Sequence, residues 1–188
     1  MSKKPPHVVL GVTGSIAAYK AAELVRLMKG RAWDVSVVMT RAATHFVGEL
    51  TFRTLSQNPV GLDMFDRVES WRPSHVGLAD RADVMAIAPC TANVLAKLAH
   101  GLADDLLTAT ALACAAPLVV APAMNVKMWE HPATQANLQT LVGRGVTLVD
   151  VGEGDLACGY QGKGRMAPVE AVLAAIQKAL GARAAGPD

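Results

Sequence analysis

The sequence predicts an α/β fold: a doubly wound parallel sheet with helices on both faces, built as a single domain. Short apolar segments alternate with helical patterns along the whole chain. These apolar segments are continuous rather than interrupted by polar residues, as expected of parallel strands covered on both faces. A length of 188 residues with 52% hydrophobic and 18% charged residues allows one substantial core and excludes general disorder.

The first quarter of the chain supplies two buried strands. Residues 7–12 (HVVLGV) and 34–39 (DVSVVM) are predicted strands because each is a short, continuous apolar run. The helical pattern between them ends at Gly30, since glycine commonly terminates helices. A second helix is predicted over residues 48–56.

The next segment, residues 58–74, is predicted to be an excursion with at most an irregular strand. It holds two prolines and a glycine and has little periodicity. We expect its Phe65 and Trp71 to pack against the rest of the domain. A helix over 75–81 and a strand over 83–88 follow.

A long uncharged run, residues 106–126, would be long enough to cross a membrane. Pro117 divides it, because proline lacks a backbone donor and disfavours helix in the residue before it. We therefore predict a buried helix over 104–114 and a buried strand over 118–121 instead of a membrane span.

The rest of the chain continues the same alternation. We predict helices over 94–100, 134–142 and 168–180 and a last strand over 146–151. Residues 152–166 contain five glycines, a density that suits a lid over a site. The domain is expected to occupy residues 1–182, with residues 183–188 forming a tail or the start of a linker.

Charge and cysteine content narrow the function classes. The formal net charge is +2 and the basic residues are scattered, which argues against nucleic-acid binding and favours small-molecule chemistry. Cys90, Cys114 and Cys158 are odd in number and form no C-x-x-C pair, so neither a disulfide framework nor a metal site is expected. Cysteines without a disulfide framework fit a protein of the reducing cytoplasm.

Polar residues and glycines follow several predicted strands where each strand ends. Open α/β sheets bind ligands at this carboxyl edge. Gly14 and Ser15 follow the first strand, where a glycine turn and a helix amino terminus can hold a phosphate. GVTGS matches neither the dinucleotide fingerprint nor the P-loop, so a plain strand–helix turn is the alternative. Thr40, Thr91 and Asn93 follow later strands and face the same edge.

Three further residues are candidates for chemistry. Asn125 follows the strand over 118–121 and could hold a substrate, but the residues alone favour a cap for the next helix. His75 opens a helix and could act as an acid or base; a capping or surface histidine is an equal alternative. Cys158 lies in the glycine-rich lid, where a structural cysteine would have no core to fill, so a functional role is favoured.

Four motifs together resemble the flavin-containing cysteine decarboxylases: His75, PCTANV at 89–94, PAMNVKMW at 122–129 and ACGYQGKGRM at 157–166. The resemblance covers nearly the whole chain. It is strongest for the branch that decarboxylates 4'-phospho-N-pantothenoylcysteine to 4'-phosphopantetheine in coenzyme A biosynthesis.

The resemblance implies a three-layer Rossmann-like (flavodoxin-like) fold that binds FMN. It implies cytoplasmic homotrimers or multiples of trimers, with phosphopantothenoylcysteine synthetase as a possible partner. Contacts with FMN are implied for Gly14, Ser15, Ile16, Thr40, Thr91, Ala92, Asn93, Val94 and Ala123.

The resemblance also implies a mechanism. Oxidation by FMN turns the cysteine side chain into a thioaldehyde, CO2 leaves to give an enethiol, and re-reduction gives the saturated thiol. His75, Asn125 and Cys158 would be catalytic, with Cys158 as the acid, and this reverses the preference for Asn125 as a mere cap. Met124, Asn125, Lys163 and Arg165 would bind substrate.

Three alternatives remain. A peptidyl-cysteine oxidative decarboxylase would stop at the enethiol, and the lid cysteine, Cys158, counts against it. A flavin prenyltransferase of similar fold would not be expected to carry PAMNVKMW. A non-catalytic flavin-binding regulatory protein would carry an acidic tail, which is not visible in this sequence.

Overall fold

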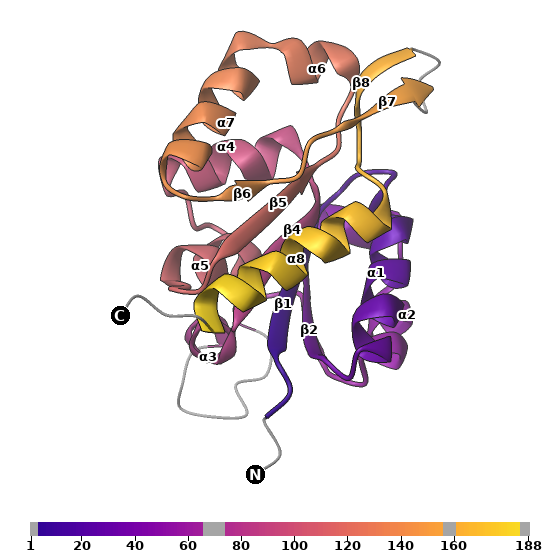
Figure 1. Cartoon of the computed structure of the whole chain (residues 1–188), viewed down its shortest axis with the longest axis vertical. Coiled ribbons are helices and arrows are strands. Elements are labelled where there is room, and N and C mark those ends of the chain that lie inside the picture. Colours follow the sequence, from indigo (N-terminus) through magenta and orange to yellow (C-terminus); the bar gives the residue numbers. More distant parts are fainter. Residues whose placement is uncertain (1–3, 66–73, 156–160, 185–188) are drawn as a thin grey trace.

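The computed structural model describes residues 4–65, 74–155 and 161–184. Within these residues a parallel sheet of six strands forms in the order β3-β2-β1-β4-β5-β6 (Figure 1). The strands are β1 (His7–Val12), β2 (Asp34–Met39), β3 (Val60–Gly61), β4 (Val84–Cys90), β5 (Leu118–Pro122) and β6 (Thr147–Leu148).

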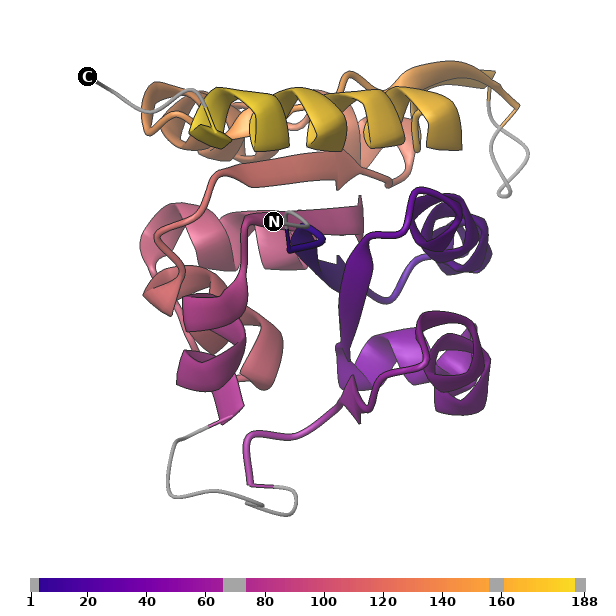
Figure 2. The same cartoon turned by 60° about the horizontal axis from the view of Figure 1, so that its bottom comes forward.

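Helices cover both faces of this sheet, which gives three layers. One face carries α1 (Ala18–Gly30), α2 (Glu49–Ser56) and α8 (Val169–Ala184), and the other carries α3 (Ser74–Arg81), α4 (Ala92–His100), α5 (Leu106–Ala113) and α7 (Pro132–Gly143). Each face has its own core: Met28, Phe52 and Ile176 pack on the first, and Leu95, Leu107 and Leu138 on the second. Figure 2 separates α1 and α2 from α4 and α5 across the sheet. The predicted fold class is confirmed.

Continuous apolar strands explain why β1 and β4 occupy the centre. Every residue of both strands is buried, as only a strand covered on two faces allows. Gly11 interrupts the apolar run of β1 for a packing reason. A Cβ atom at Gly11 would lie 2.5 Å from Cδ1 of Leu107, so glycine lets α5 approach β1 closely.

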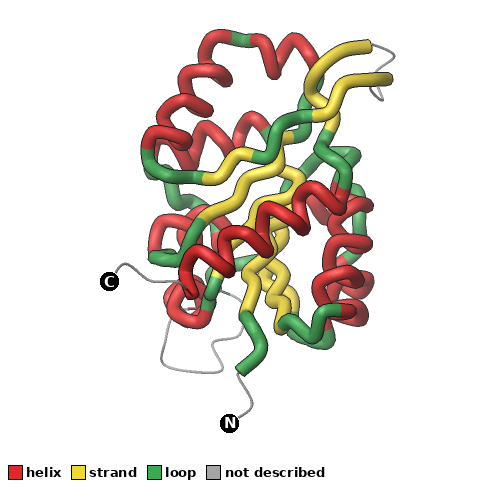
Figure 3. The backbone as a smooth tube through the Cα atoms, viewed as in Figure 1, coloured by secondary structure: helices red, strands yellow, loops and turns green. Residues whose placement is uncertain are grey.

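The order of the strands creates a switch point between β1 and β4. From β1 the chain moves outward to β2 and β3, returns to β4 beside β1, and then moves outward the other way to β5 and β6. The helices that follow β1 and β4 therefore leave on opposite faces, and a crevice is expected at the carboxyl ends of these two strands. Figure 3 shows the alternation of strand and helix that produces this path.

The polar side chain of His7 links several strands at the opposite, amino-terminal edge of the sheet. His7 Nδ1 lies 3.1 Å from Asp34 Oδ2, and His7 Nε2 lies 3.0 Å from Ser36 Oγ. The backbone N–H of His7 donates to Asp83 Oδ2 at 2.8 Å, and Asn58 Nδ2 donates to Asp34 Oδ1 at 2.7 Å. The network thus joins the beginnings of β1 to β4.

Four expectations about the elements need correction. The last strand covers only Thr147–Leu148 because the chain leaves the sheet after two pairs with β5. The glycine-rich segment, for which no strand was predicted, contains β7 (Gly152–Asp155) and β8 (Gln161–Arg165), which form an antiparallel hairpin. Helix α8 continues to Ala184, four residues beyond the predicted end. Phe65 is 86% exposed instead of packed, and Trp71 lies outside the described residues.

The uncharged run divides as predicted into helix α5 and strand β5. Asp105 begins α5 with a capping box, in which its side chain accepts from Thr108 N. Across the described ranges, the helices are too short or too polar for any of them to traverse a bilayer.

Candidate functional site

The turn after β1 presents an uncapped helix amino terminus. Ser15 N donates to Thr13 O at 2.8 Å, and Ala18 N donates to Ser15 O at 2.9 Å, which folds the turn back on itself. The N-cap residue, Ala17, has no side chain that can cap α1, although Ser15 Oγ accepts from Ala17 N at 3.3 Å, and the first turn of the helix carries no acidic residue. The positive end of the α1 dipole is thus compatible with an anion there; the contacts predicted for Gly14 and Ser15 stay a prediction.

Gly14 is required for close packing between this turn and the one that follows β2. A Cβ atom at Gly14 would lie 2.5 Å from the Cβ of Ala42, in the 3-10 helix η1 (Arg41–His45). Thr40 caps η1, because its Oγ1 accepts from Ala43 N at 3.3 Å. Thr40 N donates to Val12 O at 3.0 Å, so the two turns lie side by side.

The turn after β4 is built in the same way around Thr91. Its Oγ1 accepts from Val94 N at 3.4 Å and caps α4. Ala92 is half-buried and Asn93 is exposed, whereas Val94 is 2% exposed and belongs to the core. A ligand at this turn could therefore reach Val94 only through its backbone.

The turn after β5 carries Ala123, Met124 and Asn125. Ala123 N donates to Cys90 O at 3.0 Å, which ties this turn to the end of β4. Asn125 caps the short helix α6 (Val126–Glu130), because its Oδ1 accepts from Lys127 N at 2.9 Å. The capping interpretation of Asn125 is confirmed; a role in chemistry is compatible with it and stays a prediction.

The hairpin docks on this same turn through its glycines. Met124 N donates to Gly164 O at 2.9 Å. Gly164 has φ +137°, and a Cβ there would collide with Met124 O. A Cβ at Gly162, where φ is +153°, would lie 2.9 Å from Cγ2 of Val126. Side chains alternate along a strand, so Lys163 and Arg165 point away from this contact and are exposed.

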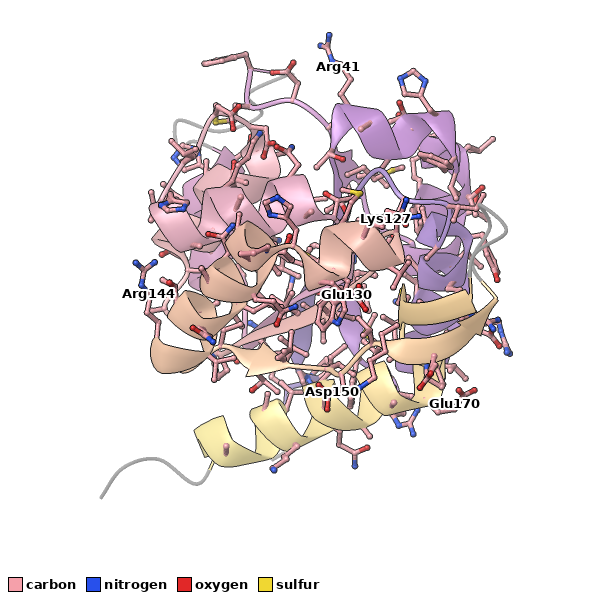
Figure 4. All side chains as sticks on the ribbon, turned by 90° about the horizontal axis from the view of Figure 1, so that it is seen from above. Arg41, Lys127, Glu130, Arg144, Asp150 and Glu170 are labelled. Atoms are coloured by element: carbon pink, nitrogen blue, oxygen red, sulfur yellow. The ribbon has the colours of Figure 1, made fainter. Side chains whose placement is uncertain are left out.

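These turns and the hairpin lie together at one end of the molecule. Figure 1 shows α6 and the β7–β8 hairpin at the end opposite the amino terminus. Figure 4 looks onto this end, with Arg41 of η1 at the periphery and Lys127 of α6 nearer the middle. The structure therefore brings together the predicted cofactor contacts, Met124 and Asn125, and the two hairpin cations.

A comparison with known proteins identifies the family of this chain. A family model described as "Flavoprotein" matches residues 1–181. The chain belongs to the flavoprotein family.

Curated relatives of this flavoprotein include two bacterial coenzyme A biosynthesis bifunctional proteins named CoaBC. The protein from Bacillus subtilis (strain 168) is 45% identical over 172 residues, which is 92% of this chain and 42% of that protein. The protein from Haemophilus influenzae is 44% identical over 170 residues, with 90% and 42% covered. The chain thus spans less than half the length of these relatives.

Solved structures give a more complete match. A cysteine-to-serine mutant of PPC decarboxylase, complexed with pantothenoylaminoethenethiol, has a TM-score of 0.84 and 35% identity, covering 93% of this chain and 98% of that one. The FMN binding protein AtHal3 has a TM-score of 0.80 and 36% identity, covering 93% and 96%. The FMN-dependent cysteine decarboxylase SpaF has a TM-score of 0.78 and 34% identity, covering 93% and 97%.

One predicted catalytic residue of the flavoprotein, His75, is not joined to these turns in the part of the chain that the structure describes. His75 is half-buried in the first turn of α3, which lies at the end of the molecule away from α6 and the hairpin (Figure 1). Within the described part of the chain, no hydrogen bond connects His75 to these turns. Cys158 lies outside the described residues. Both catalytic roles stay predictions.

Sequence reasoning missed Thr13 and Lys20. Thr13 Oγ1 donates to Pro89 O at 2.8 Å and accepts from Thr91 N at 3.0 Å, a pairing that only the folded chain reveals. Lys20 Nζ donates to Met166 O at 3.4 Å beside the root of the hairpin. Burial and the nearby charge of Arg165 lower the pKa of Lys20, against an opposing effect of Glu170. The position of Lys20 early in α1, just after the glycine turn, was a signal in the sequence that could have indicated its place near the site.

Two other features of the flavoprotein lie outside this site. Burial raises the pKa of the Cys90 thiol well above its usual range, so Cys90 is inert core packing. A hollow between α4, α5 and α7 is lined by residues such as Leu112, Leu118 and Val146. It lies at the amino-terminal edge of the sheet, where β5 begins, and so does not belong to the turns.

Proposed function

We propose that this flavoprotein binds FMN at the carboxyl edge of its sheet and decarboxylates 4'-phospho-N-pantothenoylcysteine to 4'-phosphopantetheine in coenzyme A biosynthesis. The observation that carries the proposal is the glycine-rich hairpin docked on the turn after β5, where the backbone of β8 contacts Met124 next to Asn125. The likeness to PPC decarboxylase over 98% of that chain supports it.

The turns suit a flavin mononucleotide. The α1 terminus would hold the terminal phosphate through the backbone N–H groups of Gly14 and Ile16 and the hydroxyl of Ser15. Thr40, the turn from Thr91 to Val94, and Ala123 lie at the same carboxyl edge of the sheet, where the rest of the cofactor would lie. When bound, flavin supplies a reversible two-electron acceptor, which decarboxylation of a cysteine otherwise lacks.

Exposed apolar side chains near these turns suit an aromatic ring system. Ile16 is 59% exposed, Phe46 is 47% exposed and Met128 is 48% exposed, although each is large and hydrophobic. Ile16 follows the turn after β1, Phe46 follows η1, and Met128 lies in α6. A planar ring bound here would remove apolar surface from water.

The chain's own residues then take defined roles in the proposal. The carboxamide of Asn125 holds the substrate carboxylate without adding charge. His75 assists deprotonation of the thiol or steers the charge that develops when CO2 leaves. Cys158 protonates the carbon that has lost CO2. Met124 packs against the substrate beside Asn125.

The cations at the hairpin favour an anionic substrate. Lys163 and Arg165 are exposed at β8, and the charge of Arg165 is close enough to Lys20 to lower its pKa. Like charges held near one another are stabilised by an anion between them. A phosphate on the substrate would supply that charge.

The decisive experiment measures product mass after FMN-loaded protein receives 4'-phosphopantothenoylcysteine. We expect loss of CO2 alone, with the flavin oxidised again at the end of turnover. Unchanged substrate beside an intact flavin spectrum would contradict the assigned reaction while leaving the cofactor assignment in place.

A second candidate is oxidative decarboxylation of a peptide that ends in cysteine. It is favoured by the likeness to SpaF, an FMN-dependent cysteine decarboxylase of which this chain covers 97%. The same mass measurement separates the two, because this reaction stops at the enethiol, loses two further hydrogens and leaves reduced flavin. A cysteine-ended peptide should then be the better substrate.

We also propose that the flavoprotein is a homotrimer or a multiple of trimers. Large apolar side chains outside these turns are also exposed: Phe65 is 86% exposed and Leu112 is 64% exposed. A neighbouring copy could cover them and bring its own His75 to the site, which the single chain does not do. Mass photometry of the purified protein should give a mass that is a multiple of three chains of 19.6 kDa.

We also propose that phosphopantothenoylcysteine synthetase is a functional partner of this protein. The curated relatives are bifunctional, and this chain matches 42% of the first of them. Phosphopantothenoylcysteine synthetase activity should therefore be supplied by another protein or by a further part of the same one. Coupled turnover from 4'-phosphopantothenate with added synthetase would test this.

A further inference from the structure

Thr13 connects two turns that are far apart in the sequence. It follows β1, and its side chain is 0% exposed. Its hydroxyl donates to Pro89 O at 2.8 Å and accepts from Thr91 N at 3.0 Å, on the turn after β4. A hydroxyl can donate and accept at once, which these two partners require.

The connection replaces a sheet contact that the backbone cannot make. Register pairs between β1 and β4 end at Gly11 and Ile87. Beyond them β4 reaches Pro89, which has no N–H and cannot continue the ladder. The side chain of Thr13 joins the two chains at this point.

These hydrogen bonds lie across the switch point. The chain after Thr13 enters α1 on one face of the sheet, and the chain after Thr91 enters α4 on the other. Nothing in the sheet ladder holds the two departing turns at a fixed separation. The Thr13 hydroxyl does so at the base of the crevice.

We propose that Thr13 is a positioning residue for the cofactor. It fixes the phosphate turn at Gly14 and Ser15 relative to the α4 turn at Thr91, and it thereby sets FMN affinity. Being completely buried, its side chain acts through the two turns and not by touching the ligand. The inference rests on the proposed placement of FMN between these turns.

A matched control is available in Thr110. Its side chain is also 0% exposed, and its hydroxyl donates to Leu106 O at 2.7 Å within α5, away from the turns. Thr13→Val and Thr110→Val exchange the same hydroxyl for a methyl group. Only Thr13→Val leaves a pair of partners unsatisfied across the crevice. Thr13→Ser keeps the hydroxyl.

The experiment titrates flavin-depleted protein with FMN and follows quenching of flavin fluorescence. We expect Thr13→Val to weaken FMN binding about tenfold or more, in line with a lost buried hydrogen bond. Thr110→Val should bind like the wild type, and Thr13→Ser should restore most of the affinity. Equal affinity of Thr13→Val and the wild type, or equal weakening in both valine variants, overturns the inference.

Amide hydrogen exchange of the flavin-free proteins gives an independent readout. Exchange at Thr91 and Val94 should be faster in Thr13→Val alone, and unchanged exchange there overturns the inference. Failure of the wild type to bind FMN would instead refute the proposed function. If Thr13→Val does not fold, Thr13→Cys replaces it, because its thiol is a weak donor and acceptor. The FMN affinity of Thr13→Cys should lie between that of the wild type and a value about ten times weaker.

Discussion

Asn125 shows how one side chain can serve structure and chemistry. Its Oδ1 caps α6 by accepting from Lys127 N, and its position at the end of β5 places it beside the docked hairpin. A cap needs only a short side chain with an acceptor oxygen. Holding a carboxylate needs, in addition, a donor and no negative charge. The two requirements can be separated by substitution.

Asn125→Asp should preserve the cap and strongly reduce turnover. Asp and Asn cap helices about equally well, so the melting temperature should hardly change. Two negative charges about 4 Å apart repel by about 4 kcal/mol at an effective dielectric of 20, so kcat/KM should fall by about 100- to 1000-fold. Steady-state kinetics and thermal melting check both parts. Asn125→Ser keeps the cap without the charge, and full activity in either variant would contradict the proposed role.

At the scale of elements, the β7–β8 hairpin owes its position to glycine. Gly162 and Gly164 have φ of +153° and +137°, and both face the turn after β5 with no room for a Cβ. The hairpin is therefore docked by backbone contact, and the residues between and after the glycines carry the charges. Glycine in this pattern therefore indicates that another part of the backbone approaches closely, and not only that the segment is flexible.

Gly164→Ala should undock the hairpin while leaving the sheet intact. The left-handed φ and the collision with Met124 O both oppose alanine. We expect turnover to fall about tenfold or more, with FMN affinity within about threefold of the wild type. Gly143→Ala is the control. Gly143 lies in α7, and a Cβ atom added there would meet no other atom within 4 Å. Equal activity of Gly164→Ala and Gly143→Ala would show that docking is dispensable.

The sequence predicted the sheet well and the hairpin poorly. The bounds of β1 and β2 agree with the predicted 7–12 and 34–39 because a strand buried on both faces is a continuous apolar run. The hairpin has no such signal: its pairing depends on an antiparallel partner and on contacts with Met124 and Val126, which are distant in sequence.

Part of the candidate site could also be read from the sequence. Gly14, Thr40, Thr91 and Asn125 follow strands, and parallel strands end at one edge. Thr13 could not be found this way, because its partners lie 76 and 78 residues away in the sequence. A buried threonine after a strand carries no local mark of a long-range hydrogen bond.

At the scale of the whole molecule, the two edges of the sheet differ in chemistry. The carboxyl edge gathers glycine turns and cations, whereas the amino-terminal edge is held by the buried His7 with Asp34, Ser36 and Asp83. Burial lowers the pKa of His7, although Asp34 opposes this effect; Arg81 lowers it further, Asp83 raises it and Lys4 lowers it. The sheet therefore favours a neutral His7.

Stability should fall as the pH drops below about 6.5, the ordinary pKa of histidine. Below that value the unfolded chain binds a proton that the folded chain resists, and the loss levels off once the lower folded pKa is passed. Urea unfolding between pH 7.5 and pH 5 measures this loss. His7→Gln should show a flatter profile, and His45→Gln, at the exposed end of η1, should follow the wild type. Identical profiles for all three proteins would contradict the assignment.

The hydrogen bonds that hold the turns together are largely made by main-chain atoms. Thr40 N pairs with Val12 O, Ala123 N with Cys90 O and Met124 N with Gly164 O, and among the bonds described above that join separate segments of the site, side chains contribute only through the Thr13 hydroxyl and Lys20 Nζ. Apart from Thr13, Lys20 and the two hairpin glycines, side chains on this framework can be exchanged without breaking these bonds. Descendants of one ancestral chain could thus acquire new substrates by changing residues such as Met124, while the geometry around the cofactor is inherited unaltered.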